Sequence, residues 1–316
     1  MTPAPPTPDK SAARAPSPWL VLGAALVGIS FAAPLIRLSA ADPLVIATWR
    51  LGFSLIIVAA ALLLGGGWRR WRSLSGAELG LACGAGALLA LHFWSWNASL
   101  RYTTVAASVA LVNLQPVIIA AASAWLLAEP PSRRQWLGVG VAVVGALVVG
   151  LADVPGGMSG LLAALSPGGS ASGSRALLGD LLALVGAVTA AGYYLIGRRL
   201  RQQLDLWPYV GLVYGAAFVV CLGLALGTGR ELGPQPPREL AIFAGLALGP
   251  MLLGHTGMNW ALGHLPAFVV NLTTLGEPVG ATLLAALLPG IAEVPGPWTL
   301  LGGALVLGGV LLAARR

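Results

Sequence analysis

The residues best placed to do chemistry are a few polar side chains inside long apolar segments. The strongest candidate is Glu277, in the stretch NLTTLGEPVGATLL, with Pro278 directly after it. A carboxylate in such surroundings is energetically expensive, so it normally faces a cavity or a polar partner. Burial disfavours the charged form of a carboxyl group, which suits a group that takes up and releases a proton. Binding of a substrate amine and a structural hydrogen bond are the alternatives.

Two threonines and an arginine occupy comparable positions. Thr273 and Thr274 precede Glu277 by four and three residues and therefore share its helix face. They could line the same surface, or bond to backbone carbonyls. For Arg50 we expect the guanidinium to snorkel outward along its apolar stem. Pairing with Glu277 or Asp42, or binding of a substrate carboxylate, are the other interpretations.

The segments LHFWSWNASLRY and GHTGMNWALGH hold further candidates. Their tryptophans are expected to form a belt at a membrane interface; in a cavity they would stack on a flat or cationic ligand. The histidines lack the cluster of additional ligands that a metal site needs, so we predict no metal and no other cofactor. The candidates in these segments are His92, Trp94, Asn97, His255 and Asn259.

Other apolar segments add a tyrosine and two side-chain amides. Tyr193 and Tyr194 lie near the end of one segment, and we expect one of them to reach a cavity while the other packs or anchors the helix; Tyr193 is the candidate. Asn113 and Gln115 lie in another segment. Hydrogen bonding between helices is the alternative to substrate contact for both amides.

These polar residues belong to a chain that is too apolar for a water-soluble protein. Of 316 residues, 57% are hydrophobic and 9% are charged, whereas about a quarter are charged in soluble domains. Segments of about 20 apolar residues can cross a bilayer as helices. Strands are not expected, because the segments lack period-two alternation and backbone groups in lipid must be satisfied within each segment. We expect an all-α integral membrane protein with ten transmembrane helices, at 19–38, 43–64, 76–96, 103–127, 134–151, 177–197, 207–227, 239–258, 267–288 and 297–314.

The net charge of +7 does not indicate a nucleic-acid partner, because the basic residues form short clusters between apolar segments. With the N-terminus in the cytoplasm, twelve Lys and Arg residues lie inside and five lie outside, which follows the positive-inside rule. We therefore expect both termini in the cytoplasm, in a plasma membrane of the bacterial inner-membrane type. The inside residues are Lys10, Arg14, Arg69, Arg70, Arg72, Arg133, Arg134, Arg198, Arg199, Arg201, Arg315 and Arg316, and the outside residues are Arg37, Arg101, Arg175, Arg230 and Arg238.

The chain repeats itself after a shift of 162 residues, the distance from position 115 to position 277. Without any gap, this shift aligns Asn97 with Asn259, Gln-Pro-Val at 115–117 with Glu-Pro-Val at 277–279, and one tryptophan with another at 136 and 298. Matches of asparagine, proline and tryptophan do not arise easily by chance in an apolar composition. The repeat therefore indicates two related halves.

A Gly/Ser/Pro-rich linker, 152–176, separates the two halves, which we place at 19–151 and 177–316. The tail 1–18 is rich in Pro, Ala and Ser and is expected to be disordered. Five helices in each half give the halves opposite orientations. Inverted repeats of this kind are the architecture of many secondary transporters.

Pro116 and Pro278 interrupt helices at corresponding positions of the two halves. Proline lacks an N–H and frees the carbonyl four residues earlier, at Val112 and Thr274. In inverted-repeat folds the substrate site lies near the midplane, where interrupted helices meet. We expect the freed carbonyls, with the Gln and Glu before the prolines, to face a cavity. A packing kink satisfied by neighbouring helices is the alternative.

Three long segments carry a family resemblance: ATWRLGFSLIIVAAALLL, SLRYTTVAASVALVNLQPVIIAAASAWLLAEPPSRRQWLGVGVAVVGALVV and GHTGMNWALGHLPAFVVNLTTLGEPVGATLLAAL. They resemble the EamA family of the drug/metabolite transporter superfamily, over about residues 19–314. The resemblance implies a ten-helix bundle with a central cavity, cytoplasmic termini and alternating access, and export of amino acids, other small metabolites or toxic compounds. Pro289-Gly290-Ile291-Ala292 before Glu293 departs from the family's compact Gly-Glu, so the family does not define the end of the ninth helix.

We therefore expect a secondary transporter that exports small metabolites, with a small-molecule substrate and the lipid bilayer as its partners. No Walker motif is present in the sequence, so the energy would come from a proton gradient or from the gradient of the substrate. An uncoupled facilitator or an antiporter is the alternative. An intramembrane enzyme would need a paired nucleophile and base or a second deep carboxylate, and the sequence offers neither. Monomer and homodimer both stay open.

Overall fold

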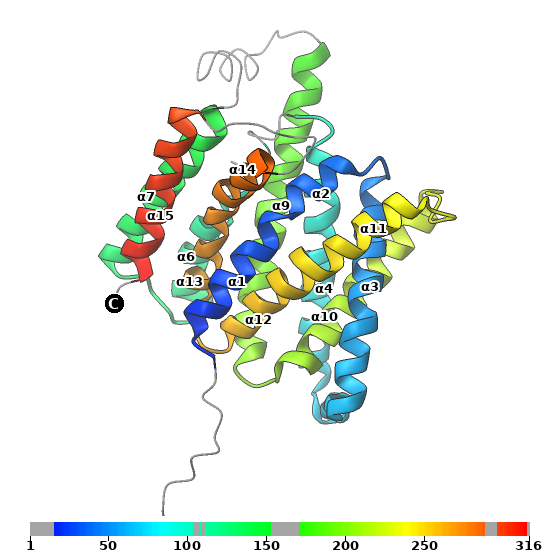
Figure 1. The fold of residues 1–316 in the computed structure, drawn as a ribbon. Helices are drawn as coiled ribbons and strands as arrows, with labels where there is room; N and C mark the ends of the chain where they lie inside the picture. The colour runs from blue at the N-terminus through cyan, green and yellow to red at the C-terminus, as the bar shows by residue number, and fades with distance from the viewer. Residues whose placement is uncertain (1–15, 104–107, 109–110, 153–170, 288–295, 315–316) are drawn as a thin grey trace, which may run out of the picture.

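The computed structural model describes residues 16–103, 108, 111–152, 171–287 and 296–314. The described part of the chain is helical and contains no strand, as the apolar segments predicted. Figure 1 shows the helices packed into one bundle. Among the described residues, six helical segments are long and apolar enough to cross a membrane, namely Pro18–Leu38, Pro43–Gly65, Gly76–Ser99, Leu177–Arg201, Leu206–Gly227 and Pro237–Leu262.

The helices divide between the two halves of the chain. The first half contains α1 (Pro18–Ser30), α2 (Ala32–Leu38), α3 (Pro43–Gly65), the 3₁₀ helix η1 (Gly67–Ser73), α4 (Gly76–Ser99), α6 (Gln115–Leu126) and α7 (Arg133–Ala152). The second half contains α9 (Ala171–Arg201), α10 (Leu206–Gly227), α11 (Pro237–Leu246), the π-helix η2 (Ala247–His255), α12 (Thr256–Leu262), α13 (Ala267–Leu272), the 3₁₀ helix η3 (Thr273–Gly276), α14 (Glu277–Leu287) and α15 (Pro297–Ala314).

The start of α9 differs from the expected one, and other expected features cannot be compared with the structure. Helix α9 begins at Ala171, six residues before the expected start at 177 and inside the expected linker. Ser and Gly residues fill its first turn, where helical N–H groups have no intrahelical partner and small polar residues are tolerated. The expected disordered tail, the middle of the linker and Glu293 lie outside the described residues, apart from positions 16–18.

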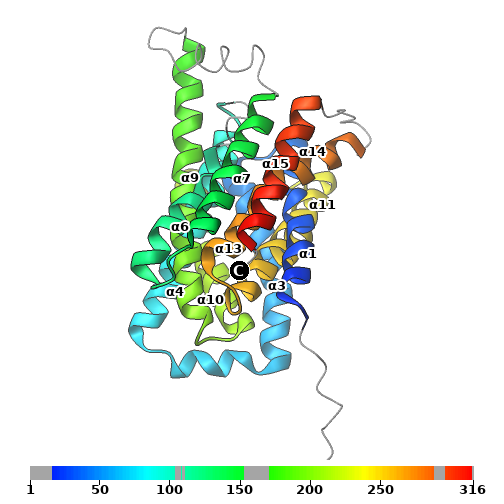
Figure 2. The same ribbon diagram turned by 90° about the vertical axis from the view of Figure 1, so that its left-hand side faces the viewer.

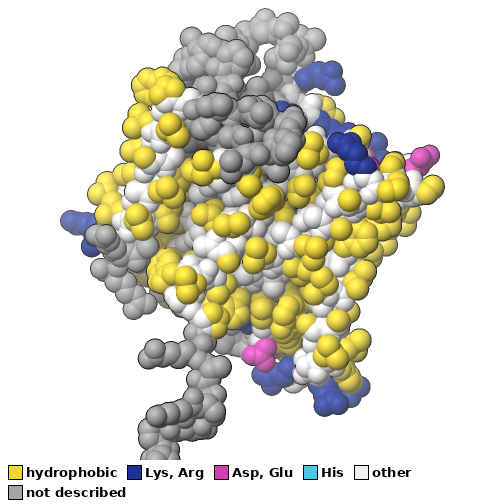
Figure 3. Space-filling model, viewed as in Figure 1, with side chains coloured by type: hydrophobic (Ala, Val, Ile, Leu, Met, Phe, Trp, Pro, Cys, Tyr) yellow, Lys and Arg dark blue, Asp and Glu magenta, His cyan; other side chains and the backbone are white. Residues whose placement is uncertain are grey.

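The surface of the bundle is apolar across its middle. Large hydrophobic side chains are exposed on most of the long helices, and Leu64 and Trp125 are each 91% exposed. Figure 3 shows hydrophobic side chains over most of one face, with charged side chains near its margins. A continuous exposed apolar surface of this extent is expected to face lipid rather than water. The protein is therefore a multi-pass membrane protein.

The repeat is visible in the bounds of the helices. Helix α6 begins at Gln115 and α14 begins at Glu277, the two positions that the shift of 162 residues relates. The same shift carries α3 onto α10, and carries α4 onto the segment from α11 through α12, within one or two residues at each end. The two halves of the sequence thus give two similar sets of helices.

Helices α7 and α15 are equivalent under this shift, and they pack directly against each other at the edge of the bundle (Figures 1 and 2). Their backbones approach closely through glycine. A Cβ atom at Gly145 would lie 2.6 Å from the backbone nitrogen of Val306 and 2.7 Å from the carbonyl oxygen of Gly302. Small residues at helix contacts permit this kind of close approach in membranes.

Gly145→Ala is expected to destabilise the protein by about 1–3 kcal/mol, because the added methyl group overlaps backbone atoms that cannot rotate away. The matched control is Gly140→Ala on the same helix, where the added Cβ meets nothing within 4 Å. Thermal unfolding of both purified variants in the same detergent measures the difference. Equal melting temperatures for the two variants would contradict the close contact between α7 and α15.

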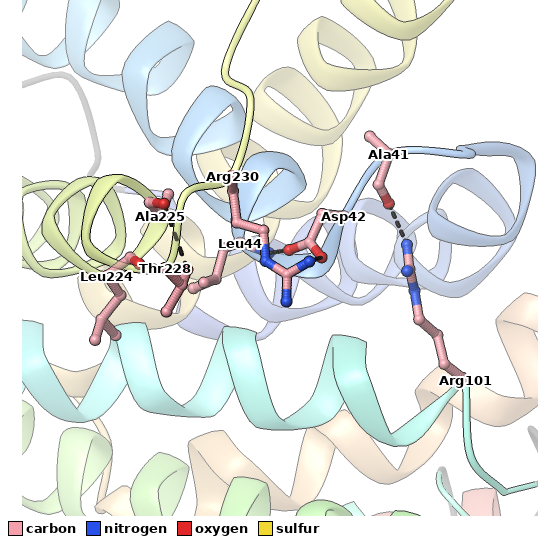
Figure 4. Close-up of polar contacts among 8 residues, drawn as sticks. All are labelled: Ala41, Asp42, Leu44, Arg101, Leu224, Ala225, Thr228 and Arg230. Carbon is pink, nitrogen blue, oxygen red and sulfur yellow. Dashed lines mark hydrogen bonds and ion pairs between the residues drawn. The ribbon is translucent and has the colours of Figure 1, made fainter.

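Polar contacts hold the loop between α2 and α3 at one end of the bundle (Figure 4). Asp42 caps α3 by accepting a 2.9 Å hydrogen bond from the N–H of Leu44, and its second oxygen lies 3.3 Å from Nη1 of Arg230. Arg101 donates to the carbonyl of Ala41. Asp42 is therefore paired with Arg230, and among the described residues it makes no ion pair with Arg50, an alternative that the sequence left open.

A second ion pair lies where α9 ends. Nη2 of Arg198 lies 2.6 Å from Oε1 of Glu129, which follows α6. Nη1 of the same guanidinium donates a 2.6 Å hydrogen bond to the carbonyl of Leu262 at the end of α12. Arg198 therefore joins one segment of the first half to two segments of the second half.

Candidate functional site

Four helices lose their regular α-helical geometry close to one another. The break between α1 and α2 lies at Phe31, the turn before α6 lies at 113–114, the π-helix η2 contains Pro250, and the 3₁₀ helix η3 separates α13 from α14. Residues from all four irregular regions line a single cavity. Non-helical backbone at membrane depth is tolerated where it lines such a cavity or is buried in protein.

The cavity collects polar groups from both halves of the chain. The space inside it that is open to the centres of water-sized molecules is about 40 Å³. The cavity is therefore narrow in this conformation. Its lining consists of Ile29, Ala32, Arg50, His92, Trp96, Val112, Asn113, Gln115, Tyr194, Pro250, His255, Met258, Thr274 and Glu277.

Arg50 lies inside the bundle, and the expectation that it snorkels outward is wrong. Its residue is 1% exposed, and its guanidinium carbon lies 4.1 Å from the centre of the Phe93 ring. Nη2 lies 3.9 Å from the sulfur of Met251, while Nε and Nη1 have no hydrogen-bond partner among the described residues. Helix α3 carries Arg50 on the face that packs into the bundle, so its stem has no route to the surface.

Glu277 is half-buried and lines the same cavity as Arg50. No ion pair within 4.0 Å joins Glu277 to any Lys, Arg or His in the part of the chain that the structure describes. Glu277 begins α14, so Pro278 occupies the first turn, where a missing N–H costs nothing. The proline therefore restarts a helix rather than kinking one.

The Thr274 carbonyl is not a free group, which corrects our expectation. The 3₁₀ geometry of η3 lets the N–H of Glu277 donate to this carbonyl. The hydroxyl of Thr274 donates a 2.7 Å bond to the carbonyl of Asn271 and accepts a 3.2 Å bond from Nε2 of Gln115. The Gln115–Thr274 bond connects the two interrupted segments, one from each half of the chain.

The rings of His92 and Trp96 together form a flat aromatic wall of the cavity. A carbonyl oxygen only accepts, so Nδ1 of His92 carries the hydrogen in its 2.9 Å bond to Gly186. The His92 and Trp96 rings stack with centroids 6.2 Å apart and an angle of 7° between their planes. His255 meets His92 edge-on at 6.4 Å. Trp96 and not Trp94 lines the cavity, because residues four apart share a helix face.

A tyrosine network lies beside the cavity. Nδ2 of Asn259 donates a 2.5 Å bond to the hydroxyl of Tyr193 and contacts the hydroxyl of Tyr214 at 3.4 Å. The Tyr214 hydroxyl lies 2.9 Å from the hydroxyl of Thr256. Tyr194 lines the cavity and donates to the sulfur of Met258 at 3.1 Å. Of the tyrosine pair, Tyr194 therefore reaches the cavity and Tyr193 packs.

The comparisons with known proteins bear on this arrangement. The model of the EamA-like transporter family matches residues 16–151 and again residues 177–315, one match in each half of the chain. The chain belongs to the EamA-like transporter family. A search of curated proteins finds no match. Among solved structures, one titled "Crystal structure of protein" is similar over 94% of this chain and 96% of its own, with a TM-score of 0.73 and 19% identity. This likeness supports the fold alone.

The EamA-family cavity holds seven of the twelve residues proposed from the sequence, namely Arg50, His92, Asn113, Gln115, His255, Thr274 and Glu277. The other five do not line it. Thr273 bonds to the carbonyl of Val269, Asn97 lies 3.4 Å from the carbonyl of Pro43, and Asn259 and Tyr193 form the network beside the cavity, while Trp94 lies off the shared face. Within the described residues, no group of three His, Cys, Asp or Glu side chains could hold a metal ion.

Sequence reasoning missed several lining residues. Pro250 lies inside an expected helix and could have indicated an interruption there, as Pro116 and Pro278 did. Trp96 could have been found from its spacing to His92. Ile29, Ala32 and Met258 carry no signal that separates them from other apolar residues of their segments.

Asn259→Leu is expected to lower the thermal stability of the protein by about 1–3 kcal/mol, because buried tyrosine hydroxyls lose a hydrogen-bond partner. The matched control is Asn271→Leu, for which the expected change in stability has the opposite sign. Both side-chain polar atoms of Asn271 are fully buried and without a partner in the described structure, so leucine should be neutral or stabilising. Equal destabilisation by the two substitutions in detergent melts would contradict the assigned network.

Proposed function

We propose that this EamA-family protein is a secondary transporter that exports a small metabolite by alternating access around the central cavity. Amino acids and related compounds are the proposed substrates, with toxic compounds as a further class. One observation carries the proposal: interrupted segments of both halves meet at a cavity that contains Arg50 and Glu277 without an ion pair between them. Sites at the interface of two repeats, built on broken helices, are typical of secondary transporters.

The proposed topology has ten transmembrane helices, in halves at 19–151 and 177–316, with both termini in the cytoplasm of a plasma membrane. Helix α1 begins and α15 ends toward the same end of the bundle (Figure 1), which supports an even number of crossings. The arginine clusters at 69–72, 133–134 and 198–201 support a cytoplasmic location for this end.

The proposed cycle opens one end of the cavity at a time. Ion pairs lie at both ends of the bundle in the described structure, Asp42–Arg230 at one end and Glu129–Arg198 at the other. Because the cavity is narrow, we propose that a metabolite enters it only when the helices at one of these ends separate. We propose that protonation and deprotonation of Glu277 couple this movement to a proton gradient.

The test is transport by purified protein in sealed proteoliposomes, with radiolabelled amino acids, nucleosides and a cationic dye as probes. We expect at least one probe to cross faster than in protein-free liposomes, and its rate to respond to an imposed pH gradient. Exchange that is stimulated by the same solute on the far side and is insensitive to pH would replace proton coupling with antiport. Transport of none of the probe classes would overturn the proposal.

A further inference from the structure

We propose that Arg50, Trp96 and Asn113 form a subsite that binds the carboxylate of the transported molecule. The proposal rests on the transport function proposed above and specifies the chemical class of its substrate. The class is a monocarboxylate with a compact apolar body. Each of the three side chains lines the cavity, and each comes from a different helical segment of the first half.

The first line of evidence is the unbalanced charge of Arg50. Its guanidinium is buried, yet its contacts are the face of Phe93 and the weakly accepting sulfur of Met251. Nε and Nη1 have no partner in the described structure. A buried cation without an acceptor is costly, so such groups normally pair or bind a ligand. Two guanidinium N–H groups can bind both oxygens of one carboxylate.

The second line of evidence is that two other side chains lining the cavity carry donors without a partner in the described structure. Trp96 is 5% exposed and Asn113 is 2% exposed, and the indole Nε1 and the amide Nδ2 have no partner in the part of the chain described. An indole N–H can only donate, and so can a guanidinium. A carboxylate accepts about four hydrogen bonds through its two oxygens, so it matches this set of donors.

The third line of evidence is the balance of charge in the cavity. Arg50 is its only fixed cation among the described lining residues, and Glu277 is its only carboxylate. A phosphate dianion would carry one more negative charge than the single guanidinium can offset. A ligand carrying only a positive charge would be repelled by the guanidinium of Arg50. Ile29, Ala32 and Met258 provide apolar contact for the rest of the molecule.

The proposal is tested by thermal stabilisation of the purified protein in detergent. The ligands are carboxylates from acetate to 3-phenylpropanoate, each beside its uncharged amide and the amine of the same length, with inorganic phosphate as the dianion. We expect at least one carboxylate to raise the melting temperature while its amide, its amine and phosphate do not. Arg50→Gln should weaken binding of that carboxylate at least tenfold, and Arg50→Lys should recover part of the affinity. The control is Arg199→Gln, which replaces an exposed arginine on α9; this variant should bind the carboxylate as the unmodified protein does.

Two further variants keep the proposal testable if Arg50→Gln does not fold. Trp96→Phe and Asn113→Leu remove one donor each while preserving bulk, and each should weaken carboxylate binding several-fold. Equal stabilisation by a carboxylate and its amide, stabilisation by no carboxylate, or unchanged affinity in the variants would overturn the subsite. Transport of cationic or neutral probes in proteoliposomes would then leave the transport function standing without this subsite.

Discussion

Glu277→Gln is expected to abolish the response of transport to a pH gradient. Glutamine keeps the shape of the side chain and its capacity for hydrogen bonding, but it cannot take up or release a proton. Since Glu277 makes no ion pair within the described residues, the substitution breaks no such contact and should leave the fold intact. Proton-driven uptake in proteoliposomes should fall at least tenfold, which corresponds to about 1.4 kcal/mol or more in the driving step.

The control for this experiment is Glu231→Gln, which removes an exposed carboxylate in the loop between α10 and α11. This variant should transport like the unmodified protein. Melting temperatures of both variants in detergent separate loss of coupling from loss of fold. If Glu277→Gln transports normally at every imposed gradient, Glu277 is not the proton carrier, and its place in the cavity needs another explanation.

Arg198→Gln is expected to destabilise the protein by about 2–4 kcal/mol. The substitution removes the ion pair to Glu129 and the bond to the Leu262 carbonyl, and it leaves a mostly buried carboxylate without its cation. These contacts join the two halves at the end of α9. Their loss should also favour conformations in which this end is open. A thiol reagent added on that side should then label a cysteine placed in the cavity faster.

A double-mutant cycle with Glu129→Gln isolates the contribution of the pair itself. The two single variants should each lose stability, and the double variant should lose less than the sum of both. Arg199→Gln, one residue away and exposed, should change the melting temperature little. Additive losses in the cycle would show that the Glu129–Arg198 contact does not hold this end of the bundle.

Local features of the sequence were sufficient for much of the fold. The apolar segments agree with the helices α3, α10 and α15 within one or two residues, because segment length and flanking polar residues are local properties. The repeat placed Gln115 and Glu277 at equivalent positions, and both begin helices. Proline in a helical segment has a direct local consequence, so these starts could be read from the sequence.

Which side of a helix faces the cavity could not be read in the same way. Arg50 lies near the start of an apolar helix, where snorkelling is usual, but its neighbours in the bundle enclose it. Tyr193 and Tyr194 are adjacent, and only the rotation of α9 decides which of them reaches the cavity. These properties depend on packing between segments far apart in the sequence. The helices are apolar on nearly all sides, so the sequence pattern does not indicate which side faces the cavity.

The contact between α7 and α15 has a consequence for the order in which the protein is made. Helix α7 is synthesised before α9 to α14, but the helix that it packs against, α15, follows all of them in the chain. Its glycine face must therefore remain in lipid until α15 has been made. A nascent chain stalled before Pro297 would expose this face to membrane chaperones and proteases, so synthesis of α15 would act as a checkpoint for assembly.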